Sequence, residues 1–425
     1  MDTFLQNLAE PWPQWLVAMA IALVAVAVIL GPALVIAGLL TWLERRVAGR
    51  VQSRVGPNRV GPQGLLQWLA DGLKLLMKED LIPGCADRPL FRLAPYLVMT
   101  GVFGAFAAVP WGLTLIPSDL NVGILYLLGV TSLVTVGILM SGWASNNKWS
   151  LLGGIRSAAQ IVSYEVPSSL SVLSVVLLTG TLSMQGIISA QGGWPWEWLI
   201  FHNPFSLVAF VIYFIAALAE GNRTPFDLPE AESELVSGYN TEYSGMRFAA
   251  FFLAEFANIY LMSAIATTLF LGGWQIPQVA VAEQLNSWPL RFVGVGFFCA
   301  KAAFLCFVVI WLRWTLPRLR VDQLMGLCYR YLIPIAFVCL LGNAVLVACV
   351  PRDSWIELGL HLATFGAGAF CCGLFVWRVG YHIRRVGDRF DWRIWTPSPK
   401  GRFEPEFQVR RYGAFRRGAA REVKR

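Results

Sequence analysis

The stretch that decides the organisation of this chain is AEGNRTPFDLPEAESELVSGYNTEYSGMRFAAFFLAEFAN, residues 219–258. Glu220 ends one long apolar segment, and Glu255 lies inside the next. Between them the stretch carries an arginine, Arg223, and five further carboxylates: Asp227, Glu230, Glu232, Glu234 and Glu242. Ionisable groups at a membrane are costly, so their default interpretation is functional.

Composition places the rest of the chain in a bilayer. Of 425 residues, 56% are hydrophobic and only 14% are charged, whereas about 25% are charged in an average soluble protein. The apolar runs are long and continuous, unlike the short alternating segments of a β-barrel. The sequence therefore predicts an all-α polytopic membrane protein.

Nine membrane-spanning helices are expected from the apolar runs. They fall near residues 15–40, 93–116, 121–143, 157–180, 205–220, 247–273, 290–314, 331–350 and 358–380. A polar insertion at 41–92 contains apolar residues at helical spacing over 65–77, which predicts an amphipathic helix on the membrane surface. The acidic loop 221–246 lies between two of the spans.

The distribution of charge predicts the orientation. Three alternate loops, near 117–120, 181–203 and 274–289, contain no Lys or Arg. The net charge of +8 comes from the segment that begins at Arg384, which holds thirteen Lys or Arg and five Asp or Glu. By the positive-inside rule, the N-terminus faces the periplasm and the basic tail faces the cytoplasm. The tail suits an acidic partner or anionic lipid; no nucleic-acid-binding motif accompanies it.

Cysteine and histidine give no metal or redox framework. None of the eight cysteines forms a Cys-x-x-Cys pair, and the three histidines, at 202, 361 and 382, are not at helical ligand spacing. No nucleotide fingerprint or phosphate loop occurs. We expect no metal and no cofactor held by this chain alone.

Clustered carboxylates are the first candidate for chemistry. Glu230 and Glu234 are four residues apart and share a face if this part is helical. Carboxylates that repel one another and are desolvated favour their protonated form, and groups that titrate near working pH can pass protons. The alternative is an ordinary solvated acidic loop. Glu220 and Glu255 weigh against it, because both lie beside or within apolar runs.

Two ionisable residues lie in or beside other apolar runs. Glu165, in QIVSYE, stands at the start of one, and Pro167 follows it. Lys301 stands in the middle of GFFCAKAAFLCF. An intramembrane Lys is expected to pair with a carboxylate or water; the alternative, snorkelling to the surface, fits its central position poorly.

The insertion 41–92 carries a basic cluster beside the first span: Glu44, Arg45, Arg46, Arg50, Arg54 and Arg59. Membrane orientation and lipid headgroups alone explain several of these charges. The functional interpretation is a docking platform for a cytoplasmic partner, or the mouth of a pocket for a lipid-like substrate. Asp71 and Lys74, one helical turn apart, pair or line that mouth.

Three long motifs resemble one family. They are TWLERRVAGRVQSRVGPNRVGPQGLLQWLADGLKLLMKED (41–80), GWASNNKWSLLGGIRSAAQIVSYEV (142–166), and AEGNRTPFDLPEAESELVSGYNTEYSG (219–245) followed by FFLAEF. With LPRLRVDQLM at 316–325, the similarity covers about residues 15–350. These stretches resemble the H-type membrane subunit of proton-translocating NADH-quinone oxidoreductase, respiratory complex I.

The resemblance implies a role at the junction of two arms of that complex. Such a subunit contacts the quinone-site peripheral subunits and helps to form the chamber that admits quinone. A path of buried carboxylates then leads to small and antiporter-like membrane subunits. The motifs place the following residues on that path, to which we add Lys301: Glu165, Glu220, Arg223, Asp227, Glu230, Glu232, Glu234 and Glu255. The expected residues of the quinone chamber are Glu44, Arg45, Arg46, Arg54, Asp71, Lys74 and Phe226.

The resemblance also implies an enzyme subunit that is active only in the assembled complex. Quinone is then its substrate, flavin and iron–sulfur clusters lie in partner subunits, and the complex lies in a bacterial inner membrane. The chain departs from the family after residue 350. We expect a family-like domain at 1–350, an additional transmembrane helix at 351–383 and a basic tail at 384–425.

Two alternatives stay open at this point. One is the related membrane subunit of a membrane-bound hydrogenase or of a dehydrogenase for the reduced deazaflavin coenzyme. The other is a stand-alone proton-coupled transporter, which is disfavoured because no internal repeat and no midplane substrate site is evident.

Overall fold

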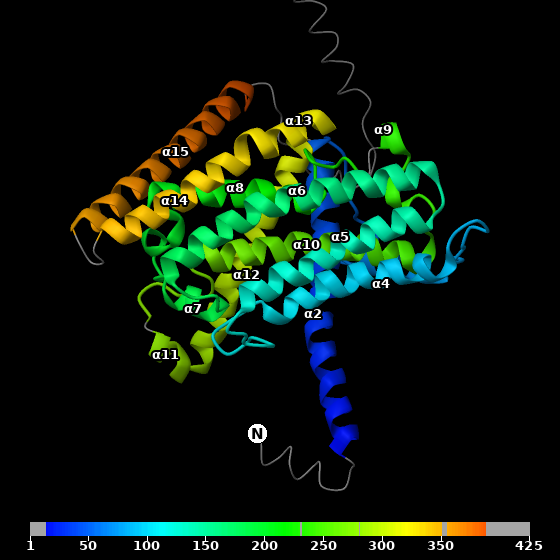
Figure 1. The fold of residues 1–425 in the computed structure, drawn as a ribbon, viewed down its shortest axis with the longest axis horizontal. Helices are drawn as coiled ribbons and strands as arrows, with labels where there is room; N and C mark the ends of the chain where they lie inside the picture. The colour runs from blue at the N-terminus through cyan, green and yellow to red at the C-terminus, as the bar shows by residue number, and fades with distance from the viewer. Residues whose placement is uncertain (1–13, 230–231, 280, 351–354, 388–425) are drawn as a thin grey trace, which may run out of the picture. The chain divides into compact units, whose positions relative to one another are not determined.

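Long helices make up the computed structural model, which describes residues 14–229, 232–279, 281–350 and 355–387 (Figure 1). No strand occurs among these residues. The chain divides into two compact units, Met1–Phe365 and Gly366–Arg425. All candidate site residues lie in the first unit, and the fold is an all-α membrane protein as predicted.

The longer helices are α2 (Gln14–Val51), α3 (Gln67–Met77), α4 (Arg88–Ala105), α5 (Gly123–Ala144), α6 (Lys148–Thr179), α8 (Pro204–Glu220), α10 (Gly245–Phe270), α12 (Trp288–Thr315), α14 (Ile333–Cys349) and α15 (Trp355–Gly387). The shorter ones are α7 (Met184–Ser189), α9 (Glu232–Leu235), α11 (Val281–Asn286) and α13 (Val321–Gly326). A π-helical turn, η6 (Leu327–Leu332), joins α13 to α14.

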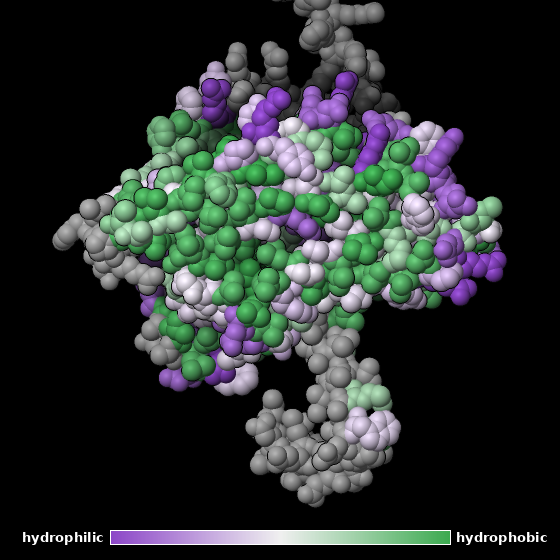
Figure 2. Space-filling model, viewed as in Figure 1, coloured by the Kyte–Doolittle hydropathy of each residue, from purple (hydrophilic) through white to green (hydrophobic). Residues whose placement is uncertain are grey.

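Seven helical segments among the described residues are long and apolar enough to cross a membrane. They are Arg88–Ala108, Gly123–Ala144, Lys148–Thr179, Gly245–Phe270, Trp288–Thr315, Val321–Cys349 and Gly359–Tyr381. Helix α8 is apolar but shorter. Each of the nine predicted spans falls on a helix, but the count of nine remains a prediction. On the face shown in Figure 2, apolar side chains cover the middle and hydrophilic ones gather along the upper edge.

Neighbouring helices pack in a continuous set. Helix α5 lies between α4 and α6, α6 also packs on α8 and α14, and α10 contacts α2, α4 and α12. In Figure 1, α2 crosses the direction shared by α4, α5, α6 and α10. A central position makes α10 the most buried of the candidate spans, so Glu255 is carried into the interior.

Two predicted boundaries were wrong, because helices continue into polar sequence. Helix α6 begins at Lys148 rather than near 157, and so Arg156 lies on the helix and not in a loop. The side chain of Asn147 accepts the backbone N–H of Trp149 and caps this end. Pro167 therefore lies deep inside α6 and not in its first turn.

The second boundary concerns the first helix, which continues past residue 40 to Val51. The segment LERRVAGR is rich in good helix formers, so the helix does not end at the membrane surface. Glu44, Arg45 and Arg46 lie on helix α2 and not in a loop. The amphipathic helix predicted over 65–77 is confirmed as α3.

Candidate functional site

The turn after α8 carries Arg223 into the interior. Its backbone N–H donates to the carbonyl of Leu218 at 3.2 Å, and this folds the chain back at the helix end. Gln160 of α6 donates to the carbonyls of Ala219 (2.8 Å) and Phe226 (2.7 Å). One buried amide therefore fixes both sides of the turn to α6, so the position of Arg223 is determined by packing.

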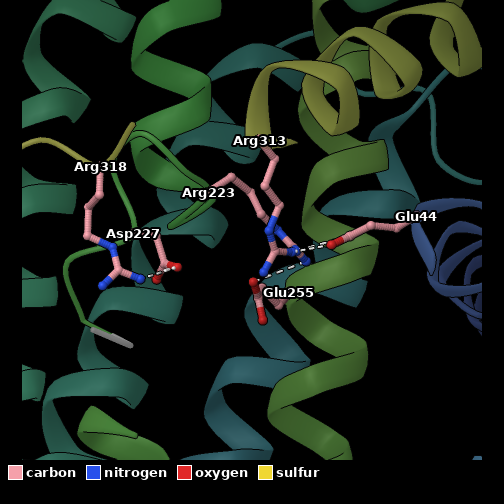
Figure 3. A network of polar contacts seen from close by, with 6 residues as sticks. All are labelled: Glu44, Arg223, Asp227, Glu255, Arg313 and Arg318. Atoms are coloured by element: carbon pink, nitrogen blue, oxygen red, sulfur yellow. Dashed lines mark hydrogen bonds and ion pairs between the residues drawn. The ribbon is translucent and has the colours of Figure 1, made fainter. Parts of the chain in front are cut away.

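The Arg223 side chain is 2% exposed and joins two carboxylates from different helices (Figure 3). It lies 3.2 Å from Glu44 of α2 and 3.0 Å from Glu255 of α10. Arg313, near the end of α12, pairs with the other oxygen of Glu44. The guanidinium of Arg223 also stacks over the ring of Phe256 at 4.3 Å. We call Glu44, Arg223, Glu255 and Arg313 the buried charge network.

Formal charges in the buried charge network balance, two against two. Removing charges from water costs several kcal/mol per ion, and close, well-oriented partners offset that cost. The loss of one partner would leave a charge uncompensated. The network is therefore sensitive to any change of charge or protonation at one of its members.

A small pocket adjoins Arg223 of the network. Its walls come from α8, α10 and α12 and are apolar, except for Arg223 and Ser263. Arg223 is thus the charged residue in a lining that is otherwise mostly apolar.

A second ion pair flanks the network. Asp227 is buried and accepts from Arg318 at 3.1 Å (Figure 3). The backbone N–H of Leu319 donates to the carbonyl of Pro225 at 3.0 Å, so the segment after α12 is tied to the acidic loop. Phe226, predicted in the chamber, is 3% exposed and packs against Tyr164 with ring centroids 5.5 Å apart. It stabilises the turn.

Helix α3 is held against the end of α2 by a surface cluster. Asp71 pairs with Arg45, lies 3.6 Å from Lys74 and accepts from Gln67 at 3.2 Å. Burial by itself would raise the pKa of Asp71, but the hydrogen bond and charge of Arg45 outweigh it and lower that pKa. Arg46 donates to the carbonyl of Gln63 at 2.5 Å.

Arg54 has a local contact only, among the interactions that the structure shows for it: its Nε donates to the side chain of Gln52 at 2.6 Å. The predicted chamber residues thus divide. Glu44 enters the buried charge network, and the Arg45–Asp71 pair fastens α3 to α2. Arg46 binds the segment before α3, Lys74 contacts Asp71 within α3, and Arg54 lies exposed just after α2.

The structure describes only some members of the acid cluster predicted at Glu230, Glu232 and Glu234. Glu234 lies on the surface, 57% exposed, and pairs with Arg156 at 2.8 Å. Glu232 begins α9, but its side chain lies outside the described set, as does the whole of Glu230. The shared face of Glu230 and Glu234 stays a prediction.

Glu165 and Glu220 form the second group of carboxylates. Ser132 of α5 donates to Glu165 at 3.1 Å. Glu220, at the end of α8, lines a small pocket with Ser168 and Tyr213. The two carboxylates lie near enough to interact electrostatically. Together with the buried charge network, they mark several ionisable sites among α5, α6, α8 and α10.

Lys301 is not brought to the carboxylates. Its Nζ donates to the backbone carbonyls of Leu271 (2.7 Å) and Gly273 (3.0 Å) and lies over the ring of Trp198 at 4.5 Å. Carbonyls at the end of α10 thus stand where a carboxylate partner was expected. Along α12, Lys301 is about 18 Å from Arg313 at 1.5 Å per residue. It binds carbonyls at the C-terminal end of α10, away from the buried charge network.

Three residues of the site were not predicted as such: Gln160, Arg313 and Arg318. For Arg318 a signal existed, since LPRLR at 316–320 belongs to one of the family-like motifs. Gln160 is a buried polar residue inside another motif, and its role appears only when α6 meets the turn.

The fold and the site define a multi-pass α-helical membrane protein with an ionised interior. The sequence profile of the NADH dehydrogenase family matches residues 23–344. The chain is 54% identical over 395 residues to the H-type subunit of NADH-quinone oxidoreductase from Anaeromyxobacter dehalogenans, covering 90% of this chain and 94% of that one. The corresponding protein of Chlorobaculum tepidum is 51% identical over 309 residues (72% and 86%). That of Bacteroides thetaiotaomicron is 43% identical over 362 residues (85% and 96%).

The chain belongs to the family of H-type membrane subunits of NADH-quinone oxidoreductase, the complex I family. The relative from Anaeromyxobacter corrects one expectation. Its alignment covers more of this chain than residues 1–350 contain, so part of the segment after residue 350 has a counterpart in that protein.

Proposed function

We propose that this chain forms part of a quinone-binding chamber and couples quinone reduction to proton translocation. The observation that carries the proposal is the contact of Arg223 with both Glu44 and Glu255 beside an apolar cavity. A quinone has a polar headgroup and an apolar body, and the pocket beside the network has a mostly apolar lining that includes the charged residue Arg223. The names of the relatives favour this interpretation over a hydrogenase subunit.

Coupling follows from the shared arginine. If Glu44 gains a proton or its position shifts when quinone is reduced nearby, Arg223 is held less strongly on that side and more strongly by Glu255. The change therefore passes from α2 to α10. Glu220 and Glu165 continue the proposed path, with Asp227, Glu230, Glu232 and Glu234 at its cytoplasmic border. Lys301 donates to backbone carbonyls at the C-terminal end of α10, and its role depends on that position.

The remaining partners follow from the same proposal. Peripheral subunits carry the flavin and iron–sulfur clusters, and the chain is active only within the assembled complex. The Arg223 end of the helices faces the cytoplasm, with the N-terminus in the periplasm and the basic tail inside. Arg45, Arg46, Arg54 and Lys74 present positive charge to the peripheral subunits. The chain holds no cofactor of its own.

The test uses Glu255→Gln in the assembled complex, reconstituted in vesicles. Asp119→Asn, an exposed carboxylate in the loop between α4 and α5, is the control. We expect Glu255→Gln to lower quinone-linked NADH oxidation about tenfold, as for lost stabilisation of the reaction. Proton uptake should fall with it, while electron transfer from NADH to a soluble acceptor stays normal. Normal rates of both quinone reduction and proton uptake in a fully assembled variant would refute the proposal.

A further inference from the structure

Three helices meet at a buried polar cluster that lies apart from the buried charge network. Helices α6, α8 and α14 pack on one another (Figure 1). Each carries one polar residue that is at most 1% exposed: Ser174, Ser206 and Asn343. The amide nitrogen of Asn343 donates to the hydroxyl of Ser174. A Cβ on Gly342 would lie 2.7 Å from the ring of Phe205, so α14 contacts α8 next to Asn343 and Ser206. We call Ser174, Ser206 and Asn343 the three-helix cluster.

Two polar atoms of the three-helix cluster have no protein partner. The amide oxygen of Asn343 and the hydroxyl of Ser206 form no hydrogen bond with any residue that the structure describes. Unpaired polar atoms are costly in a protein interior, and ordered water that makes about three hydrogen bonds is their common partner. Because the two atoms lie on helices in contact, they offer a site for water inside the bundle.

A surface pocket lies one helical turn beyond the three-helix cluster. Each of the three helices, with the residue that caps α8, contributes to its lining a residue three or four positions from the cluster: Leu178, Asn203 and Val347. Residues at this spacing share a face of a helix. Val347 is 44% exposed, so the pocket reaches the surface of the chain. Water at that surface is therefore about 5.4 Å, one turn, from the three-helix cluster.

In the other direction, serines of α6 lead from the three-helix cluster to Glu220. Ser171 and Ser168 precede Ser174 at intervals of three residues, and all three are at most 2% exposed. Ser171 donates to the carbonyl of Pro167 at 2.9 Å, and its oxygen can still accept. Ser168 lines a small pocket with Glu220. A ridge of buried hydroxyls, about 9 Å long at 1.5 Å per residue, thus links the cluster to a carboxylate.

Helix α8 shows how much of the membrane this route crosses. Ser206 lies in its first turn, and Glu220 is its last residue. The rise between them is about 21 Å at 1.5 Å per residue, against about 30 Å for the hydrocarbon core of a bilayer. The surface pocket lies beyond Ser206, so Glu220 and the pocket are near opposite membrane surfaces.

We propose that water bound at the three-helix cluster completes a path by which protons leave Glu220 and reach the surface pocket. Water and hydroxyl groups both donate and accept hydrogen bonds, so a proton that enters the chain at one end displaces one at the other. Polar side chains inside a membrane protein commonly form such relays. The inference rests on the proposed role of Glu220 in proton translocation, and it gives those protons an exit within this chain.

Radical footprinting of the purified, assembled complex tests for the water. Hydroxyl radicals made by an X-ray pulse oxidise a buried thiol where water is bound beside it. Ser206→Cys places a thiol in the three-helix cluster. Ser141→Cys on α5 is the matched control, because Ser141 is 0% exposed and its hydroxyl already donates to the carbonyl of Ile138. We expect the thiol at 206 to be oxidised severalfold faster than the thiol at 141.

Addition of Asn343→Leu to Ser206→Cys should remove this difference, because leucine cannot bind water. Equal oxidation of the two thiols without Asn343→Leu, or fast oxidation at 206 that persists with it, overturns the water site. Should the Asn343→Leu chain fail to assemble, Ser174→Ala takes its place in the same comparison.

Proton translocation in reconstituted vesicles tests the function of the path. We expect Asn343→Leu and Ser174→Ala to lower the rate about tenfold, as for a lost proton-relay group. Ser141→Ala should keep the wild-type rate, and electron transfer from NADH to a soluble acceptor should be normal in all three variants. Wild-type translocation in both path variants overturns the path. If Glu255→Gln is impaired at the same time, only the path is wrong; if Glu255→Gln is also normal, the proposed coupling itself fails.

Discussion

The thiol of Cys328 donates a hydrogen bond to the backbone carbonyl of Ser163, with the sulfur 3.1 Å from the oxygen. This contact compensates for a backbone hydrogen bond that is missing in α6. Proline has no N–H, so Pro167 cannot bond the carbonyl four residues before it, which is that of Ser163. The π-helical turn η6 brings Cys328 to this carbonyl, and Tyr329 to the Ser163 hydroxyl at 3.0 Å. The free carbonyl of α6, the helix that carries Glu165, is thereby hydrogen-bonded by a residue of another segment.

Replacement of Cys328 tests this repair. Cys328→Val removes the donor in a fully buried place and should destabilise the protein by about 1–3 kcal/mol, the cost of an unsatisfied buried polar group. Cys328→Ser keeps a donor and should be milder. The stability of both variants is measured by thermal unfolding of the purified complex, with the loss of this chain from the complex as the signal. Cys339→Val, at another buried thiol, is the control. Equal losses in Cys328→Ser and Cys328→Val would speak against a hydrogen-bonding role.

The buried charge network predicts that the effects of two mutations on stability are strongly coupled. Arg223→Met removes the guanidinium that Glu44 and Glu255 share and should cost about 3–5 kcal/mol, as for other broken buried pairs. Arg223→Met combined with Glu255→Met removes both charges and should recover much of the loss, while Glu44 keeps Arg313. The yield and melting temperature of the complex report the coupling. If the double variant is no more stable than Arg223→Met, the pair is not coupled in this way.

The Asp71–Arg45 pair predicts a dependence on pH at α3. The pKa of Asp71 is lowered in the folded protein. Its contribution is therefore present above the ordinary pKa and is lost as pH falls through the lowered value. Both groups are partly exposed, so the effect is about 1 kcal/mol or less and weakens with salt.

A spin label at Leu73→Cys, on the exposed side of α3, measures this. Label mobility should rise as the pH is lowered in an otherwise wild-type chain. In an Asp71→Asn background it should be high already at neutral pH and change little. The unsubstituted chain gives the background from native thiols. A wild-type profile in Asp71→Asn is the result that excludes a role for this pair.

The sequence predicted the helices and identified the carboxylates of interest, but it did not predict which residues pair with them. Long apolar runs specify where helices lie, because a bilayer demands them. They do not specify that Arg313 turns toward Glu44, since the two residues are far apart in sequence and meet only through the packing of α12 and α2. Lys301 illustrates the same limit. The sequence predicted a carboxylate or water as its partner, whereas its ammonium donates to two backbone carbonyls at the end of α10.

Gly153 carries the last prediction, because it controls how closely the acidic loop approaches α6. A Cβ on this residue would lie 2.7 Å from Cα of Gly238 and 2.8 Å from the backbone nitrogen of Tyr239. These are backbone atoms and cannot rotate away. Gly153→Ala should therefore push residues 238–240 off α6 and cost about 1–3 kcal/mol, as overpacking does. The shift would also disturb the nearby Asn147–Glu242 contact, now 2.7 Å.

Gly129→Ala on α5 is the matched control, since a Cβ there meets nothing within 4 Å. In a helix interior this change should be neutral or stabilise by about 0.5–1 kcal/mol. The two alanine variants thus have opposite expected signs for the same chemical change. Melting temperature and proteolysis of the loop 221–246 in the purified complex distinguish them. Gly153→Ala with wild-type stability and an equally protected loop would show that α6 and the loop can separate without cost, and the acidic loop would then not be positioned by this contact.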